Sequence, residues 1–375
     1  MRFPEFTEEW RKYKVSDVLD FYSTNSLSWE QLDYNNEDLY NLHYGLIHVG
    51  LPILVDIGQN KLPGIKTECK PKNFELCKEG DVAFADASED TNDVAKAIEF
   101  VNLNNQKTIC GLHTIHGRDN KYLTVLGYKG YAFASPLFHN QIRRIAQGTK
   151  IYSISSKNFA ECYIGIPSKD EQSKIARLLA LIDSRIATQN KIIEQLQSLI
   201  KGIVVSITTE TPNTRIDKCL VCHSSTLQEN HIEDFGDFPV YGANGICGYT
   251  VNADFKEPAI LIVKDGSGVG NVRFVNGKYS VIGTQNILTP QNRFCLKYIF
   301  YCLKAFNFMP YKTGMAIPHI YFKDYGKSKI YCPNFEQQVK IASQIDLIES
   351  KIEIETQLLN KYEEQKKFLL SNMFI

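Results

Sequence analysis

The chain has 375 residues, of which 43% are hydrophobic and 22% charged, and this composition excludes a disordered or low-complexity protein. Its 42 Lys and Arg residues balance 42 Asp and Glu residues, so the net charge by itself argues against a polyanion partner. The apolar runs are too short to cross a bilayer, and the N-terminus has no apolar segment of a secretory signal. We therefore expect a cytoplasmic protein of two or three domains, without membrane contact, whose ten cysteines are reduced thiols.

Residues 1–166 predict a first mixed α+β domain. Asp- and Asn-rich turns at 33–36 and 102–105 separate short β-like runs such as LTVLGY and KIYSIS. Residues 118–157 contain seven Lys and Arg residues but only one acid, Asp119. The histidines near this tract could touch phosphate, although isolated core or surface histidines are commoner. They are His113, His116 and His139.

Residues 167–207 predict a long amphipathic helix. Pro167 marks the boundary, and Ser168 with Glu171 three residues later matches a capping box. Roughly 35 helical residues extend roughly 50 Å, more than a small domain needs for its own core. The apolar stripe, spaced mostly by three and four, comprises Ile175, Leu178, Ile182, Ile186, Ile193 and Leu196. Gln189 interrupts it, which is typical of a coiled-coil seam, and packing along the preceding domain is the alternative.

Residues 208–332 predict a second mixed α+β domain, which the breaker TTETPNT opens. Its strand-like runs are PAILIVK, NVRFVNG, KYSVIG and NILTP, and CLKYIFYCLKAF has helical periodicity. Residues 256–329 contain eleven Lys and Arg residues but only three acids. Two basic tracts at equivalent places, interleaved with aromatic residues, indicate a nucleic-acid surface better than net charge does, with solvated surface lysines as the alternative.

Residues 333–375 predict a second long helix, which begins with Pro333, Asn334 and Gln337. Glu355 interrupts its stripe, which comprises Ile341, Ile345, Ile348, Ile352 and Leu359. Residues 148–207 align without a gap with residues 314–373, an offset of 166, with fifteen identities. A repeat of this length indicates one module used twice.

Several short motifs mislead. Cys219 and Cys222 with the following histidine match a haem-attachment pattern, but no export signal is present and no second pair gives zinc-finger spacing. Residues 266–270 are glycine-rich but precede another strand, which favours a hairpin that could approach DNA over a phosphate loop. Residues 326–328 lack the upstream glycine of an ATP-binding motif. The sequence predicts no catalytic centre and no metal site.

Taken together, the chain resembles a specificity subunit of a type I restriction-modification system over its whole length. The most specific segments are IGIPSKDEQSKIARLLALIDSRIATQNKIIEQLQ and IYCPNFEQQVKIASQIDLIESKIEIETQLLNKYEEQ. In the second domain YGANGICGYT, ILIVKDGSGVGNV and TQNILTP are similar to the family's domain core, and in the first FADASED and GLHTIHGRD are. The second helix departs from the pattern by reading Phe-Glu-Gln-Gln, a one-residue shift of the Glu.

The resemblance implies two target-recognition domains, 1–166 and 208–332, each reading one half of a split double-stranded DNA target. It implies that the spacer helices, 167–207 and 333–375, pair as an antiparallel coiled coil, set the spacing and dock two modification (methyltransferase) subunits, which a restriction subunit joins. S-adenosylmethionine, Mg and ATP would belong to those partners, and this chain would be non-catalytic. The candidate DNA contacts are Arg118, Lys121, Lys129, Arg143, Arg144 and Lys150 in the first domain, and Lys264, Arg273, Lys278 and Lys312 in the second.

Two other hypotheses compete with this one. The chain could be a nuclease or methyltransferase whose catalytic residues are cryptic, or a DNA-free scaffold that binds proteins. Titration with S-adenosylmethionine or a metal tests the first, and salt-dependent binding to duplex DNA tests the second.

Overall fold

The computed structural model describes residues 1–228, 232–291, 293–314 and 317–374. The chain forms two compact units, Met1–Asn190 with Leu358–Ile375, and Lys191–Gln357. Both unit boundaries fall inside the long helices, so the units are not the four predicted segments, whose limits stay a prediction. Within the described residues, no helix combines the length and apolarity needed to cross a membrane.

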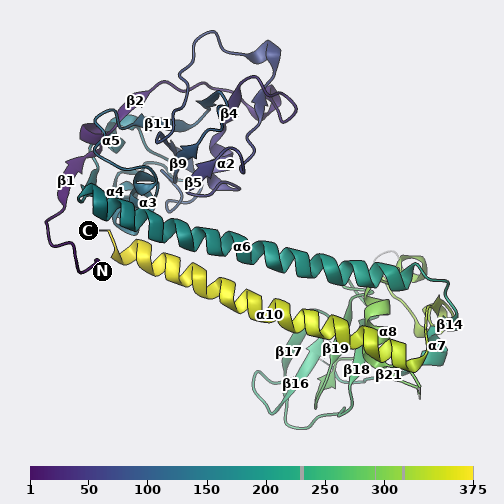
Figure 1. Cartoon of the computed structure of the whole chain (residues 1–375). Helices are drawn as coiled ribbons and strands as arrows, with labels where there is room; N and C mark the ends of the chain where they lie inside the picture. The colour runs from purple at the N-terminus through teal and green to yellow at the C-terminus, as the bar shows by residue number, and fades with distance from the viewer. Residues whose placement is uncertain (229–231, 292, 315–316, 375) are drawn as a thin grey trace. The chain divides into compact units, whose positions relative to one another are not determined.

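The first unit is built on two sheets (Figure 1). The five-stranded sheet runs, in spatial order, β2 (Asp20–Tyr22), β11 (Thr114–Arg118), β7 (Val82–Ala85), β9 (Ala97–Asn102) and β5 (Leu54–Asp56). Its pairs are antiparallel except for β5 with β9. The four-stranded sheet runs β10 (Thr108–Cys110), β4 (Tyr40–Leu42), β6 (Gly64–Ile65) and β3 (Leu32–Asp33).

Short strands and helices complete this unit. Two antiparallel pairs join distant parts of the chain: β1 (Arg11–Lys14) with β13 (Tyr163–Ile166), and β8 (Ala87–Ser88) with β12 (Tyr152–Ser153). The helices are α1 (Val15–Val18), α2 (Tyr44–His48), α3 (Tyr128–Ala134), α4 (Pro136–Ile145) and α5 (Ser156–Ala160), with 3-10 turns at Trp29–Gln31 and Thr67–Cys69. Rings of Phe84, Phe133, Phe138 and Phe159 pack edge to face or tilted at the centre of the core, an arrangement that aromatic rings favour.

The second unit repeats this plan in smaller form. An antiparallel sheet runs β15 (Leu220–Ser224), β21 (Gln285–Pro290), β18 (Ala259–Val263) and β19 (Val272–Val275). A three-stranded sheet runs β17 (Gly245–Thr250), β16 (Phe238–Gly242) and β20 (Ser280–Val281), and β14 (Thr214–Arg215) pairs with β22 (Lys329–Ile330). The helices are α7 (Ile216–Cys219), α8 (Leu296–Lys304) and α9 (Phe322–Tyr325), with a 3-10 turn at Met309–Tyr311.

The two predicted long helices are confirmed as α6 (Lys169–Thr208) and α10 (Phe335–Asn372). In the first unit, Ile175 and Ile182 of α6 share a core with Leu369 of α10, and Lys366 pairs with Asp183 at 2.6 Å. In the second unit, the late residue Ile207 shares a core with the early residues Ala342 and Ile345. In each unit an early part of one helix meets a late part of the other, so the helices pair antiparallel.

The predicted stripe residues of both helices are all buried or half-buried. Gln189 and Glu355, the polar residues within the stripes, are buried as well, as a coiled-coil seam requires. The first turns of α6 also pack on their own domain, because Ile175 shares a core with Tyr128 and Phe159. The helix therefore packs both on its own domain, through its first turns, and on the other long helix.

Only one of the two hydrogen bonds of the predicted capping box is formed: the side chain before each helix accepts from the backbone N–H three residues later. The Ser168 hydroxyl accepts from the Glu171 N–H at 3.4 Å, and Asn334 Oδ1 accepts from Gln337 N at 2.9 Å, so the shifted Glu of the second helix leaves its cap intact. The Glu171 carboxylate does not complete a capping box, because the Arg2 guanidinium binds both of its oxygens at 2.7 Å.

Candidate nucleic-acid interface

A buried glutamine anchors the start of α6 to the first domain. Gln172 Oε1 accepts from Val125 N at 2.9 Å, while Nε2 donates to Pro167 O at 2.9 Å and to Leu123 O at 3.1 Å. Two tyrosines of α3 add to this anchor: Tyr128 Oη donates to Gly165 O at 2.6 Å, and Tyr131 Oη donates to Asp183 Oδ2 at 2.8 Å. We call such a glutamine with its two tyrosines the helix-start clamp.

The second unit contains an equivalent helix-start clamp. Gln338 Oε1 accepts from Cys295 N at 3.0 Å, and Nε2 donates to Pro333 O at 2.8 Å. Tyr298 Oη donates to Tyr331 O at 2.9 Å, and Tyr301 Oη contacts the carboxylates of Asp346 and Glu349 at 2.7 Å. The separation of the two tyrosine pairs along the chain differs from the separation of the two repeated segments. An alignment without gaps therefore does not match the pairs with each other. The Tyr-x-x-Tyr spacing was the signal that could have found them.

The repeated segment begins in both units with a tight hairpin. Gln147 bridges Ser153 in the first unit, and Thr313 bridges His319 in the second. Gly148 and Gly314 have φ of 144° and 87°, and a Cβ at either position would collide with a carbonyl oxygen across the hairpin. This steric constraint explains why glycine occupies both positions.

Equivalent backbone bonds help to dock the two hairpins on their own units. Ile154 N donates to Asp86 O and Ile320 N donates to Lys264 O, both at 2.9 Å. Ile151 and Ile317, which are also equivalent, are each more than half exposed. Both hairpins therefore present side chains at the surface from a shared framework.

Three of the first domain's candidate DNA contacts are exposed and close together along the chain. Arg143 and Arg144 stand on the last turn of α4, and Lys150 lies on the hairpin that follows; all are exposed. Arg143 Nη1 donates to Asn92 Oδ1 at 3.0 Å. The β8–β12 pairing brings the chain that leads to Asn92 beside the same hairpin. Arg144 also lines a cavity of about 750 Å³ with Arg2, Glu9, Trp10 and Lys12.

Arg118 and Lys129 were predicted wrongly as DNA contacts, because both are buried. Arg118 binds both oxygens of Asp81 at 2.8 Å and also reaches Glu75. Lys129 pairs with buried Glu99 at 3.0 Å, and that carboxylate also accepts from the N–H groups of Gly127 and Gly130. Burial raises the pKa of Glu99. Both cations neutralise buried acids, so their charge is not available to a phosphate at the surface.

Lys121 is exposed but separate from the Arg143 group. Its Nζ donates to Asp17 O at 2.7 Å, which places it beside α1. The neighbouring Asn120 carboxamide donates to Asp20 and Tyr22 of β2. Lys121 therefore remains a candidate contact at a different part of the first domain.

In the second unit the glycine-rich segment 266–270 joins antiparallel β18 and β19, which confirms a hairpin and rules out a strand–helix phosphate loop. Gly266 and Gly270 both have φ of 90°. Gly266 N donates to Pro318 O at 3.0 Å, and Asp265 Oδ1 lies 2.6 Å from His319 Nδ1. The glycine-rich hairpin and the 313–319 hairpin are therefore neighbours.

The four cations of the second unit do not form one group. Lys264 lies half-buried at the end of β18, and Arg273 stands on β19 with its guanidinium 5.9 Å from the Tyr241 ring. Lys278 lies beyond the opposite end of β19, with Nζ 5.5 Å from the Phe238 ring. Lys312 is half-buried directly before the 313–319 hairpin. The structure thus gathers Lys264 and Lys312 beside the paired hairpins and separates Lys278 from them.

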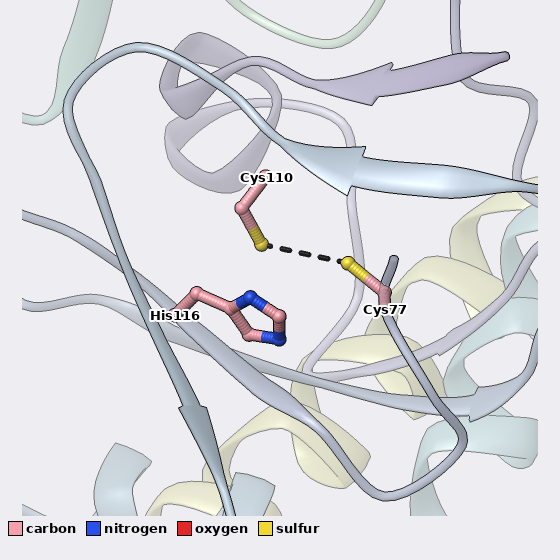
Figure 2. A group of neighbouring side chains, drawn as sticks. All are labelled: Cys77, Cys110 and His116. Carbon is pink, nitrogen blue, oxygen red and sulfur yellow. Dashed lines mark hydrogen bonds between the residues drawn. The ribbon is translucent and has the colours of Figure 1, made fainter. Parts of the chain in front are cut away.

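The histidines and cysteines occupy mostly structural positions. His116 and the ring of His139 are buried, whereas His113 is half exposed and lies 3.2 Å from Asp86. Cys219 is buried 3.8 Å from Cys332, which supports a structural role over haem attachment. No metal ligands were predicted, yet the structure brings Cys77, Cys110 and His116 together (Figure 2), three residues whose sequence spacing matches no motif.

Comparison with known proteins identifies the relatives of this chain. A family model described as "Type I restriction modification DNA specificity domain" matches residues 111–198 and 221–364, more than half of the chain. The EcoprrI specificity subunit of Escherichia coli is 26% identical over 109 residues, which cover 29% of this chain and only 27% of that protein. A putative type I specificity subunit of Mycoplasma genitalium is 25% identical over 279 residues, covering 66% of this chain and 70% of that protein.

Two solved structures share the fold. The S subunit of a type I restriction-modification system from M. genitalium superposes with a TM-score of 0.63 at 18% identity, covering 100% of this chain and 99% of that one. A chain from a structure on complex assembly and conformational transition of the type I system superposes with a TM-score of 0.56 at 14% identity, covering 98% and 97%.

Proposed function

Because the chain belongs to the type I restriction modification DNA specificity family, we propose that each of its two domains reads one half of a split double-stranded DNA target. The observation that carries the proposal is the repeated framework. Each unit has a helix-start clamp and a glycine-turned hairpin, but the side chains presented by the surface loops differ. One framework with two unlike surfaces is suited to recognising two unlike half-sites.

The exposed loops supply the groups that read bases and phosphates. In the first domain Arg143, Arg144 and Lys150 can bind phosphates, and an arginine can also bind guanine in a bidentate manner. In the second domain Ser267 and Asn271 are exposed at the glycine-rich hairpin, next to the strand that carries Arg273. Hydroxyl and carboxamide groups on such loops donate to and accept from base edges.

The paired helices serve as spacer and docking surface in this proposal. Two domains on one face of a duplex must sit about one helical turn, roughly 34 Å, apart. Helices of 40 and 38 residues, at a rise of about 1.5 Å per residue, are long enough to set such a distance. Apolar side chains outside the packed stripes are exposed on them, which favours contact with other proteins. They include Leu181, Leu199, Phe335, Leu347 and Ile354.

The chemistry belongs to partner subunits in this proposal. Two modification subunits would bind the helices and a restriction subunit would join that complex, bringing S-adenosylmethionine, Mg and ATP. The chain itself would be a non-catalytic, cytoplasmic DNA-recognition subunit. An S-adenosylmethionine titration of the isolated chain should show no binding, and tight binding would favour the competing methyltransferase hypothesis.

A domain exchange tests the proposal. Residues 208–332 are replaced by those of a relative, the hybrid is assembled with its modification subunits, and methylated adenines are mapped in genomic DNA. One half of the target should change while the other half and the spacing stay constant. If both halves change, or neither does, the two-domain reading is wrong. If the chain binds no duplex DNA at low salt, the protein-scaffold hypothesis gains instead.

A further inference from the structure

Cys77, Cys110 and His116 form a compact buried group inside the first unit (Figure 2). Their ligand atoms all lie within 4.8 Å of one another, and the three side chains are at most 6% exposed. Cys110 ends β10 of the four-stranded sheet, and His116 lies in β11 of the five-stranded sheet. Cys77 N donates to Thr108 O at 2.8 Å, which holds its segment against β10.

One nitrogen of the His116 imidazole has a hydrogen-bond partner and the other has none. Nε2 lies 2.7 Å from Asp81 Oδ2, whereas Nδ1 is buried without a hydrogen-bond partner. Figure 2 shows that one ring nitrogen is turned toward the two sulfur atoms, and Nδ1 is the one left free by Asp81. A buried nitrogen without a partner is costly, and a cation between it and the sulfurs would remove that cost.

From these contacts we propose that Cys77, Cys110 and His116 bind a thiophilic divalent cation, zinc by preference. Zn–S bonds of about 2.3 Å in a tetrahedron place two sulfurs about 3.8 Å apart. The two Sγ atoms lie 3.6 Å apart before any metal is considered. The corresponding S–N edge is about 3.6 Å. The ligand atoms of the three residues already lie within 4.8 Å of one another, so shifts of about 1 Å bring the histidine nitrogen to that edge. The separation of the donors therefore suits the ion.

The surroundings match those of a metal-bound histidine. A ligating imidazole usually donates its second N–H to a carboxylate, which fixes the ring and its tautomer. Asp81 does this for His116, and Arg118 in turn holds Asp81 through both oxygens. Two thiolates neutralise the dication, and soft sulfur ligands favour zinc over magnesium or calcium. The fourth position is left to water or another small ligand.

Zinc at this place would join the two sheets of the first domain. Residues 111–113 connect β10 to β11, and they carry the exposed His113 beside Asp86. A metal fixed at both ends of this connection would hold the surface loop in place. Such a zinc site is independent of DNA recognition, since all three ligands lie in the interior of one domain.

Metal analysis of the full chain tests the inference. The chain is purified from zinc-supplemented cells, dialysed, and its zinc measured by mass spectrometry. We expect one zinc ion per chain, and loss of that zinc in Cys110→Ser and His116→Gln. Cys69→Ser is the matched control, because Cys69 is a half-buried cysteine of the same domain outside the group. Equal zinc in the control and in both ligand variants would overturn the inference.

A spectroscopic measurement on the unaltered chain avoids dependence on folding of the variants. Cobalt substituted for zinc should show thiolate-to-metal charge-transfer absorption, and X-ray absorption at the zinc edge should show two sulfur neighbours and one imidazole. A chain that retains no metal, or whose Cys77 and Cys110 are found as a disulfide, would also overturn the inference. A zinc edge without sulfur neighbours would place the ion elsewhere and have the same consequence.

Discussion

Replacing Gln172 with alanine should selectively destabilise the first unit. The side chain makes three hydrogen bonds, to Val125 N, Pro167 O and Leu123 O. Alanine removes the partner of these buried or partly buried backbone groups, and each net bond contributes about 1 kcal/mol. We expect a loss of about 3 kcal/mol in the free energy of unfolding. With an m-value of about 2 kcal/mol per molar urea, the midpoint falls by about 1.5 M.

Tryptophan fluorescence can follow the first unit by itself. The chain has two tryptophans, Trp10 and Trp29, and both lie in that unit. Gln172→Ala should therefore lower the urea midpoint of the fluorescence transition. Gln338→Ala, the equivalent change in the second unit, should lower a transition seen by far-ultraviolet circular dichroism and leave the fluorescence midpoint in place.

An exposed carboxamide of the same helix and the same unit is the matched control. Asn190 is exposed on α6 within the first unit, so Asn190→Ala should change stability by at most about 0.5 kcal/mol. If Gln172→Ala has the same fluorescence midpoint as this control, the helix-start clamp contributes no stability and the reasoning fails. If Gln338→Ala shifts the fluorescence as far as Gln172→Ala does, the clamps do not act on separate units.

Charge, pH and backbone geometry in the first unit can each be tested by substitution. Lys129→Met leaves Glu99 buried without its cation and should lower the free energy of unfolding in urea by about 3–5 kcal/mol. Arg143→Ala should leave stability unchanged and reduce the slope of log affinity for DNA against log salt by about 1. If Lys129→Met reduced that slope and Arg143→Ala lowered the stability, Lys129 and not Arg143 would be the DNA contact. Burial lowers the pKa of His139 below its ordinary value of 6.5, so below pH 6.5 the unfolded chain binds a proton more readily than the folded chain does, and stability should fall as the pH drops below 6.5. His139→Gln should flatten that part of the pH profile in fluorescence-monitored unfolding, and an unchanged profile would assign the effect to another group. Gly148→Ala forces a side chain into a left-handed turn and should lower the free energy of unfolding by about 1–3 kcal/mol, and a thermal midpoint equal to that of the unaltered chain would contradict the steric reading.

The sequence alone determined the long helices, their pairing stripes and the module used twice. Helical periodicity is local, because each residue of the stripe meets neighbours three or four positions away. The stripe of α6 and its boundary at Pro167 could therefore be predicted without knowing any distant contact. The repeat at 148–207 and 314–373 was likewise visible because its identities include turn and capping residues with local steric reasons, such as Gly148.

Only the tertiary structure decided which basic residues are available at the surface and which side chains meet inside. Arg118, Lys129 and Arg143 are equivalent members of a basic tract in the sequence, but only Arg143 is exposed. Arg118 and Lys129 are buried because the sheet brings an acid from another part of the chain next to each of them. Arg118 pairs with Asp81, and Lys129 pairs with Glu99. The group of Cys77, Cys110 and His116 has the same origin, because strand pairing joins residues whose separation along the chain carries no signal.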